Sequence, residues 1–156
     1  MIVLAIDQGN NHFGYSVWDK DKLYKYGNFT TKLTTEDERY IRLKEVYDEL
    51  VSLIDCYEPD IVVCEGLWYG QNINTFKNLV MINAFLLQLS WERNFQFKEI
   101  NIRKYRHFFG IKGKSEVKKF ILTSFPDIVV DKKLDITDAI LLGQYIVKKG
   151  YDLEKC

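Results

Sequence analysis

Acidic side chains follow two apolar runs of this chain, each at the point where the run ends. Asp7 comes directly after residues 2–6 (IVLAI), and Glu65 follows residues 61–64 (IVVC). A carboxylate at the end of a buried strand is costly to remove from water unless it is paired or binds a cation. Carboxylate oxygens are the ligands that Mg²⁺ and Mn²⁺ prefer. The two positions are therefore candidate ligands of a divalent metal ion.

A second acidic pair lies near the C-terminus. Asp135 and Asp138 are three residues apart and precede the apolar residues 139–142, so on a helix they share one face. Acids in the first turn of a helix often only stabilise its N-terminus, and this alternative applies to the pair taken alone. Joined to Asp7 and Glu65, the pair predicts one cluster of four catalytic, metal-binding acids. Four carboxylates suit two Mg²⁺ ions in each active site, with Mn²⁺ as a substitute, for hydrolysis of a phosphodiester.

Length and composition indicate a single domain that spans residues 1–156. A hydrophobic fraction of 47% and a charged fraction of 28% are typical of a globular protein, and no apolar run is long enough to cross a membrane. The three cysteines have no metal-ligand spacing, and His12 and His107 stand alone, which argues against a zinc site. Without a leader-like segment at the start of the chain, we expect reduced thiols and a cytoplasmic location, in a bacterium or an infected host.

Basic residues gather in one segment. Residues 98–119 hold eight basic side chains and two acids, Glu99 and Glu116, in a chain whose formal net charge is zero. The basic side chains are Lys98, Arg103, Lys104, Arg106, Lys112, Lys114, Lys118 and Lys119. A basic surface beside an acidic metal site suits an enzyme that follows a phosphate backbone. The alternative is the solvated face of an ordinary helix.

Apolar and alternating runs predict five strands, at residues 2–7, 13–18, 22–30, 60–65 and 95–100. Helical spacing predicts a long helix that begins near Thr35, in a capping box with Glu38, and stops before Pro59. Further helices are predicted at about residues 74–91, 101–109, 114–124 and 134–149, the last of them ended by Gly150.

The order of these elements predicts an α/β fold. The first three strands are joined by short turns and form an antiparallel meander, whereas strands 60–65 and 95–100 each follow a helix and lie parallel to the first. The result is a five-stranded mixed sheet, three antiparallel strands plus two parallel strands, with helices on both faces. Asp7 and Glu65 then lie at the carboxyl edge of neighbouring parallel strands, where open α/β sheets bind ligands.

Three motifs resemble those of RuvC-type Holliday junction resolvases. They are residues 5–17 (AIDQGNNHFGYSV), 59–72 (PDIVVCEGLWYGQN) and 135–139 (DITDA), which agree in order and spacing over nearly the whole chain. The resemblance implies an RNase H-like fold and a homodimer that nicks four-way DNA junctions in symmetric pairs with Mg²⁺. It also assigns the catalytic acids to Asp7, Glu65, Asp135 and Asp138.

The chain departs from the family pattern at several positions. Gln8 stands where cellular members usually carry Pro, Gly66 where they carry Gln, and the basic loop around residue 112 is shorter. Lys114 best matches the functional lysine of that loop, and a second family lysine falls at Tyr105. The divergence suits a phage-encoded member. The DNA-binding residues that we predict are Trp68, Tyr69, Arg103, Lys104, Arg106, Lys112, Lys114 and Lys118.

Trp68 and Tyr69 follow Glu65 in a loop that contains Gly70. Exposed aromatic side chains there could stack on unpaired bases at a junction centre, and Trp68 aligns with an aromatic wedge position of the family. The alternative is that Trp68 packs onto the following helix.

The helix predicted at 74–91 is apolar on nearly every side. Ten of its residues 79–91 are apolar, all but Asn83, Gln88 and Ser90. Such a helix needs more than one buried face, so it could pack on the sheet and on a twin helix across a two-fold axis. The alternative is a central core helix in a monomer.

Other functions remain open at this point. One is an RNase H-like nuclease that acts on RNA–DNA hybrids or other nucleic acid, and another is a non-catalytic protein that binds junctions. A sugar- or acetate-kinase-like phosphotransferase shares the Asp-x-Gly-Asn pattern of residues 7–10, but it needs two such domains, for which 156 residues are too few. No helicase partner can be named.

Overall fold

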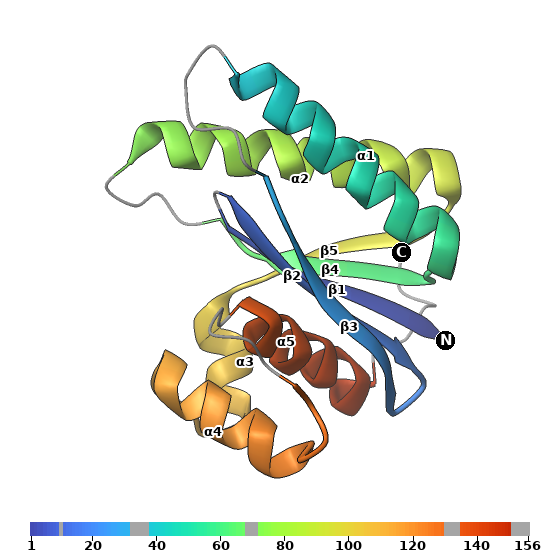
Figure 1. The fold of residues 1–156 in the computed structure, drawn as a ribbon. Helices are drawn as coiled ribbons and strands as arrows, with labels where there is room; N and C mark the ends of the chain where they lie inside the picture. The colour runs from blue at the N-terminus through green and yellow to red at the C-terminus, as the bar shows by residue number, and fades with distance from the viewer. Residues whose placement is uncertain (10, 32–37, 68–71, 130–134, 151–156) are drawn as a thin grey trace.

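Five strands form one sheet that lies between two layers of helices (Figure 1). The structure is a computed structural model, and it describes residues 1–9, 11–31, 38–67, 72–129 and 135–150. The strand order is β3-β2-β1-β4-β5. The strands are β1 (Ile2–Gln8), β2 (His12–Asp19), β3 (Lys22–Thr30), β4 (Ile61–Glu65) and β5 (Gln96–Ile100).

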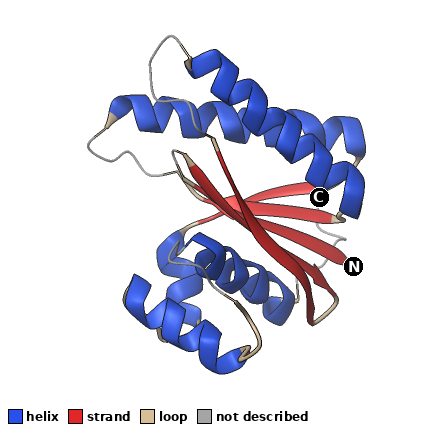
Figure 2. Cartoon of the chain, viewed as in Figure 1, coloured by secondary structure: helices blue, strands red, loops and turns tan. Residues whose placement is uncertain are grey.

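The pairing of the strands confirms the predicted mixed sheet. β1 pairs with β2, and β2 with β3, in antiparallel fashion, whereas β4 lies parallel to β1 and β5 lies parallel to β4. The antiparallel meander therefore comes from three strands joined by short turns, and each parallel strand is reached through a helix. Figure 2 shows the helices on both faces of this sheet.

The helices agree with the prediction in number and order over the described residues. They are α1 (Arg39–Tyr57), α2 (Ile73–Arg93), α3 (Ile102–Phe108), α4 (Lys114–Ser124) and α5 (Asp135–Lys149). α1 and α2 cover one face of the sheet, and α5, with α3 and α4 beside it, covers the other (Figure 1). None of these helices has both the length and the apolar content needed to cross a membrane.

The start of the first helix differs from the prediction. Glu38 is the residue before the first helical one and its side chain makes no capping hydrogen bond, so it cannot serve as the third helical residue of a capping box. Its backbone has turn geometry (φ −87°, ψ 0°), and the helix begins at Arg39 for that reason. Thr35, the other member of the predicted box, lies outside the described residues.

The other helix ends have local causes that the sequence shows. The side chain of Asn72 accepts hydrogen bonds from the backbone N–H groups of Asn74 and Thr75 at the start of α2. Gly150 follows α5 with a φ of +61°, a left-handed conformation that glycine adopts without strain.

Alternation along the strands decides which face each side chain occupies. Val3 and Ala5 pack in the core beneath α5, whereas Leu4 and Ile6 pack in the core beneath α1 and α2. Because successive side chains of a strand point to opposite faces, Asp7 continues on the side of α5.

The same alternation applies to β4. Ile61 and Val63 belong to the core on the side of α5, and Val62 and Cys64 to the core on the other side, so Glu65 also points toward α5. Ile6 is paired with Cys64 in the parallel register, so the next residues along the two strands are Asp7 and Glu65.

α5 packs closely on β2 because a glycine on each element faces the other element. An added Cβ at Gly14 would overlap the backbone oxygen of Asp135, and one at Gly143 would overlap the indole of Trp18. The hydroxyl of Ser16 donates to the carbonyl of Ala139 (2.8 Å). These contacts bring the first turn of α5 to the strand that pairs with β1, and so beside Asp7.

Candidate active site

The four predicted acids come together at one end of the sheet. Asp7 and Glu65 occupy the carboxyl ends of β1 and β4, and Asp135 and Asp138 occupy the first turn of α5. The charges of Glu65, Asp135 and Asp138 all raise the pKa of Asp7, which places the four acids in one cluster. Asp7 and Asp138 are buried, and Glu65 and Asp135 are partly exposed. The cluster therefore contains two buried carboxylates and two that solvent can reach.

Burial and like charge make this cluster costly in the absence of a cation. The pKa of Asp7 is raised well above its ordinary value, chiefly by burial and then by the charges of Asp138 and Glu65. The pKa of Glu65 is also raised, by burial and by Asp138, although a hydrogen bond with Asp7 opposes the shift. Carboxyl groups with raised pKa values that face one another are typical of catalytic and ion-binding sites.

Two basic side chains from the segment 98–119 reach into the cluster. Nη2 of Arg106 donates to Oδ1 of Asp138 at 2.8 Å. Nζ of Lys114 lies 3.8 Å from Oδ2 of Asp138 and 3.9 Å from Oδ1 of Asp135. Arg106 comes from α3 and Lys114 begins α4, so both short helices serve to bring a cation to the acids.

A family model decides the relationship of this chain to known proteins. Residues 3–142 match the model described as "Crossover junction endodeoxyribonuclease RuvC". The chain belongs to the RuvC family. The match includes all three motifs and the four acids of the cluster, so the predicted family resemblance is confirmed.

Named RuvC proteins match over nearly their whole length. One from Alkaliphilus oremlandii is 27% identical over 150 residues, which cover 92% of this chain and 90% of the relative. One from Dictyoglomus turgidum is 26% identical over 160 residues, which cover 96% of this chain and 98% of the relative. Both are named crossover junction endodeoxyribonucleases.

Solved structures with a similar fold confirm that this chain has the predicted RNase H-like fold. The structure described as T. thermophilus RuvC in complex with Holliday junction substrate superimposes with a TM-score of 0.78 at 13% identity, and covers 96% of this chain and 97% of that chain. The yeast mitochondrial Holliday junction resolvase Ydc2 superimposes with a TM-score of 0.66 at 15% identity, and covers 94% of this chain and 77% of that chain. At these identities the likeness concerns the fold alone.

RuvC proteins depend on a metal, and the residues of this cluster fit one. All of the donors are carboxylate oxygens, as a hard divalent cation requires. Oδ2 of Asp138 is buried and has no hydrogen-bond partner, which is the state expected of an oxygen held for an ion. Among the described residues, however, no three acidic, His or Cys side chains already form a ligand cage. Asp138 and Asp135 are paired with basic side chains instead.

The other predicted DNA-binding residues differ in their exposure. Arg103, Lys104 and Lys112 are exposed on α3 and on the turn before α4, and Lys118 is half-buried on α4. Trp68 and Tyr69, the predicted aromatic contacts, lie outside the described residues. Arg106 stands apart because its side chain is only 15% exposed and pairs with Asp138.

Several residues of the site were not found by sequence reasoning. Nε2 of Gln8 donates to the backbone carbonyl of Glu65 at 3.2 Å and so ties the end of β1 to the end of β4. Tyr105 is buried close to Glu65, Asp138 and Asp7, and burial followed by those charges raises the pKa of its phenol. A glycine inside a strand often marks the close approach of another backbone, and Gly14 carried this signal.

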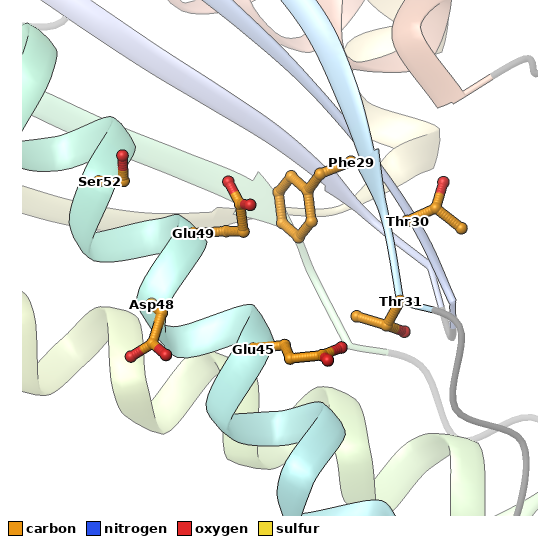
Figure 3. A pocket seen from close by; sticks show the side chains of 7 residues that line it. All are labelled: Phe29, Thr30, Thr31, Glu45, Asp48, Glu49 and Ser52. Atoms are coloured by element: carbon orange, nitrogen blue, oxygen red, sulfur yellow. The ribbon is translucent and has the colours of Figure 1, made fainter.

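A hollow of about 500 Å³ lies on the opposite face of the sheet, between the end of β3 and α1 (Figure 3). It contains none of the predicted site residues, and its acids would repel a phosphate backbone. We therefore do not assign it to the nuclease site. Its lining residues are Phe29, Thr30, Thr31, Glu45, Asp48, Glu49 and Ser52.

Proposed function

We propose that this RuvC-family chain is a metal-dependent endonuclease that resolves four-way DNA junctions by paired, symmetric nicks. The observation that carries the proposal is the position of Asp138. Its buried carboxylate lies beside those of Asp7 and Glu65 at the carboxyl edge of the sheet, with one oxygen that lacks a hydrogen-bond partner. An arrangement of that kind is costly to fold and is explained by the chemistry that it supports.

We assign Asp7, Glu65, Asp135 and Asp138 as the residues that hold Mg²⁺ or Mn²⁺, two ions in each site. When bound, such ions activate water at neutral pH and stabilise the charge of the leaving oxygen. The protein supplies the fixed positions of the carboxylates. The ends of β1 and β4 hold Asp7 and Glu65, and the packing of α5 on β2 holds the other two acids.

The substrate follows from the relatives and from the charge of the surface. The named relatives are crossover junction endodeoxyribonucleases, and one similar structure was solved with a Holliday junction. Arg103, Lys104 and Lys112 are exposed on the segment that also carries Arg106 and Lys114, and a phosphate backbone can bind to them. Lys114 is half exposed and only loosely held by its acids, so it can turn to a phosphate near the cut.

Two sites are needed for paired cuts, and α2 offers a surface for a homodimer. Ile73, Val80 and Leu87 are exposed at intervals of seven residues, and Trp91 extends the same stripe. Ala84 fills the stripe between Val80 and Leu87. Spacing of three and four residues is that of helices which pack along a shared seam. The inner face of α2 is already buried by Ile82, Leu86 and Leu89, so the stripe is a separate face, available to a second copy.

The deciding experiment compares three substrates with Mg²⁺ present. They are a synthetic four-way junction, an RNA–DNA hybrid and a linear DNA duplex of the same sequence, with the nicks mapped on every strand. We expect symmetric nicks on two opposing strands of the junction and little cleavage of the others. Preferred cleavage of the hybrid would instead favour an RNase H-like nuclease of a different specificity.

The variant Asp7→Asn separates catalysis from binding. We expect it to bind the junction and to cleave it at least about a hundredfold more slowly, because ion-assisted catalysis contributes several kcal/mol to the lowering of the barrier. Cleavage at the wild-type rate would refute the metal site. A wild-type protein that binds junctions and never cuts them would mean a non-catalytic binding protein. The single domain over 1–156, the cytoplasmic location and the phage origin stay predictions.

A further inference from the structure

We propose that Arg106 is a counter-ion built into the acidic cluster, which stabilises the metal-free protein and fixes the carboxylate of Asp138, and that it is not a contact to DNA. This inference rests on the proposed function, because it takes Asp138 to be a metal ligand. The sequence predicts DNA binding for Arg106, because the residue lies in the basic segment 98–119. The inference replaces that role.

The geometry of the pair is that of a largely buried salt bridge. Nη2 of Arg106 lies 2.8 Å from Oδ1 of Asp138, and the side chains are only 15% and 2% exposed. The bond occupies one oxygen of Asp138 and leaves Oδ2 without a hydrogen-bond partner. A bond from a neighbouring group that fixes the orientation of a metal ligand is a common feature of metal sites. Arg106 is therefore a positioning residue for Asp138.

The charge of the cluster explains why a permanent cation is placed there. Asp7 and Asp138 are buried, and neighbouring carboxylates make ionisation of Asp7 and Glu65 less favourable. A guanidinium stays protonated at every relevant pH, whereas the charge of a buried lysine is easily lost. Among the residues that the structure describes, Arg106 is the basic side chain with a short bond to one of the four acids.

Lys114 provides the contrast within the same site. Its ammonium lies 3.8 and 3.9 Å from Asp138 and Asp135, beyond hydrogen-bond length, and its side chain is 52% exposed. A cation held so loosely can leave for a phosphate at little cost. Arg106 cannot do so without breaking the short bond to the buried Asp138, which is strongly unfavourable. The two cations therefore have different roles, although the sequence places both in one basic segment.

The test measures thermal unfolding without DNA, in EDTA and over a titration with Mg²⁺. Arg106→Gln is compared with the wild type and with Lys114→Gln, the matched control. We expect Arg106→Gln to unfold about 6 °C or more below the wild type in EDTA, as the loss of a partner from a buried pair implies. We expect Mg²⁺ to raise its melting temperature by more than it raises that of the wild type, because the ion then supplies the missing positive charge. Lys114→Gln should differ from the wild type by about 2 °C or less in EDTA.

An Arg106→Gln protein that melts like the wild type in EDTA, and loses only affinity for DNA, would overturn the proposal. If Arg106→Gln does not fold, the double variant Arg106→Gln, Asp138→Asn decides the matter. It should fold, and should melt close to Asp138→Asn alone, because no charge on Asp138 remains to be offset. A double variant that also fails to fold would show that Arg106 acts through packing, and would overturn the counter-ion role.

The same melting measurements distinguish a failure of the counter-ion role from a failure of the proposed metal site. A wild-type protein whose melting temperature does not respond to Mg²⁺ would contradict the metal site. The cycle of single and double variants in EDTA would still report the bond between Arg106 and Asp138. A wild-type protein that responds to Mg²⁺, with an Arg106→Gln variant that responds no more strongly, would contradict the counter-ion role alone.

Discussion

Gly14 is paired with Asp7 across β1 and β2, and it is also a point at which α5 touches the sheet. A Cβ added to Gly14 would overlap the backbone oxygen of Asp135. A residue without a side chain therefore allows the acids on α5 to approach the acid on β1. The geometry of the cluster depends on this contact as well as on the acids themselves.

The variant Gly14→Ala should push the first turn of α5 away from β2. We expect a loss of about 1–3 kcal/mol of stability, because the neighbouring atoms are backbone and cannot turn aside. We expect cleavage to fall by about a hundredfold, since a displacement of about 1 Å in a catalytic group can cost that much. Chemical denaturation and a junction cleavage assay measure the two effects.

Gly113→Ala is the matched control for this change. A Cβ at Gly113 meets no atom within 4 Å, and the residue has an extended backbone (φ −152°) that alanine also adopts. It should lose about 1 kcal/mol or less, because Gly113 stands at the N-cap of α4, where a change to alanine typically costs about that much. Equal effects of the two substitutions would show that contact with α5 is not what Gly14 contributes.

The charge on Asp7 should make the metal-free protein less stable as the pH rises. Burial, with Asp138 and Glu65 nearby, raises the pKa of Asp7 in the folded state above the unfolded value of 3.8. Above that pH the unfolded chain releases the proton while the folded protein still holds it, so the free energy of unfolding decreases as the pH rises toward the folded pKa. Asp7→Asn removes the titrating group, so it should melt above the wild type in EDTA at pH 7–8.

The difference between Asp7→Asn and the wild type should shrink as the pH falls, and should be smallest near and below pH 3.8, where Asp7 is protonated in both states. Thermal melts in EDTA at a series of pH values measure it. The same melts with Mg²⁺ should favour the wild type, because the ion binds to the intact cluster. A variant less stable than the wild type in EDTA at pH 8 would contradict the argument.

Sequence reasoning located the four acids because their positions follow from local patterns. Asp7 and Glu65 end short apolar runs rich in β-branched residues, which predict buried strands, and the order of elements makes those strands parallel neighbours. Asp138 lies in the first turn of an apolar helix, and a helical pattern of that strength fixes which residues share a face. Each of these inferences needs only the period of the pattern and the order of the elements.

The contacts of the basic residues could not be predicted in the same way. Arg106 and Asp138 are 32 residues apart, and they meet only because α3 packs against α5 at a particular angle. The sequence shows that residues 98–119 are basic, but it cannot show which cation points to the acids and which to solvent. The hydrogen bond from the Gln8 side chain to the backbone carbonyl of Glu65 depends likewise on side-chain geometry that no pattern encodes.

The exposed lysine on the turn before α4 should contribute to binding of the DNA backbone. Lys112 is exposed on the same segment as Lys114, and only its backbone N–H is engaged, with Glu116. We expect Lys112→Gln to weaken binding of the junction whatever its sequence, and to lower the slope of log affinity against log salt by about 1. Binding of a labelled junction to the protein without divalent ions, at several salt concentrations, measures this.

Lys44→Gln is the control for that measurement. Lys44 is exposed on α1, on the opposite face of the sheet, and forms an ion pair with Asp48 in the next turn. Its removal should change the overall charge by the same amount and leave the salt slope as it is. Equal changes for the two variants would mean that the effect comes from net charge and not from a contact at Lys112.

The stripe on α2 should hold two copies of the chain together. Leu87→Lys places a charge in the middle of the exposed seam, and we expect it to raise the dissociation constant of the dimer by at least about 30-fold, as the loss of a central apolar contact does. Gln88→Lys adds the same charge one residue away, next to Glu92, and should leave the dimer intact. Sedimentation at micromolar concentrations distinguishes the two.

The Leu87→Lys protein should also cut one strand of a junction at a time, because two sites no longer act on the same molecule. A wild-type protein that sediments as a monomer at these concentrations would show that the seam is not a dimer interface.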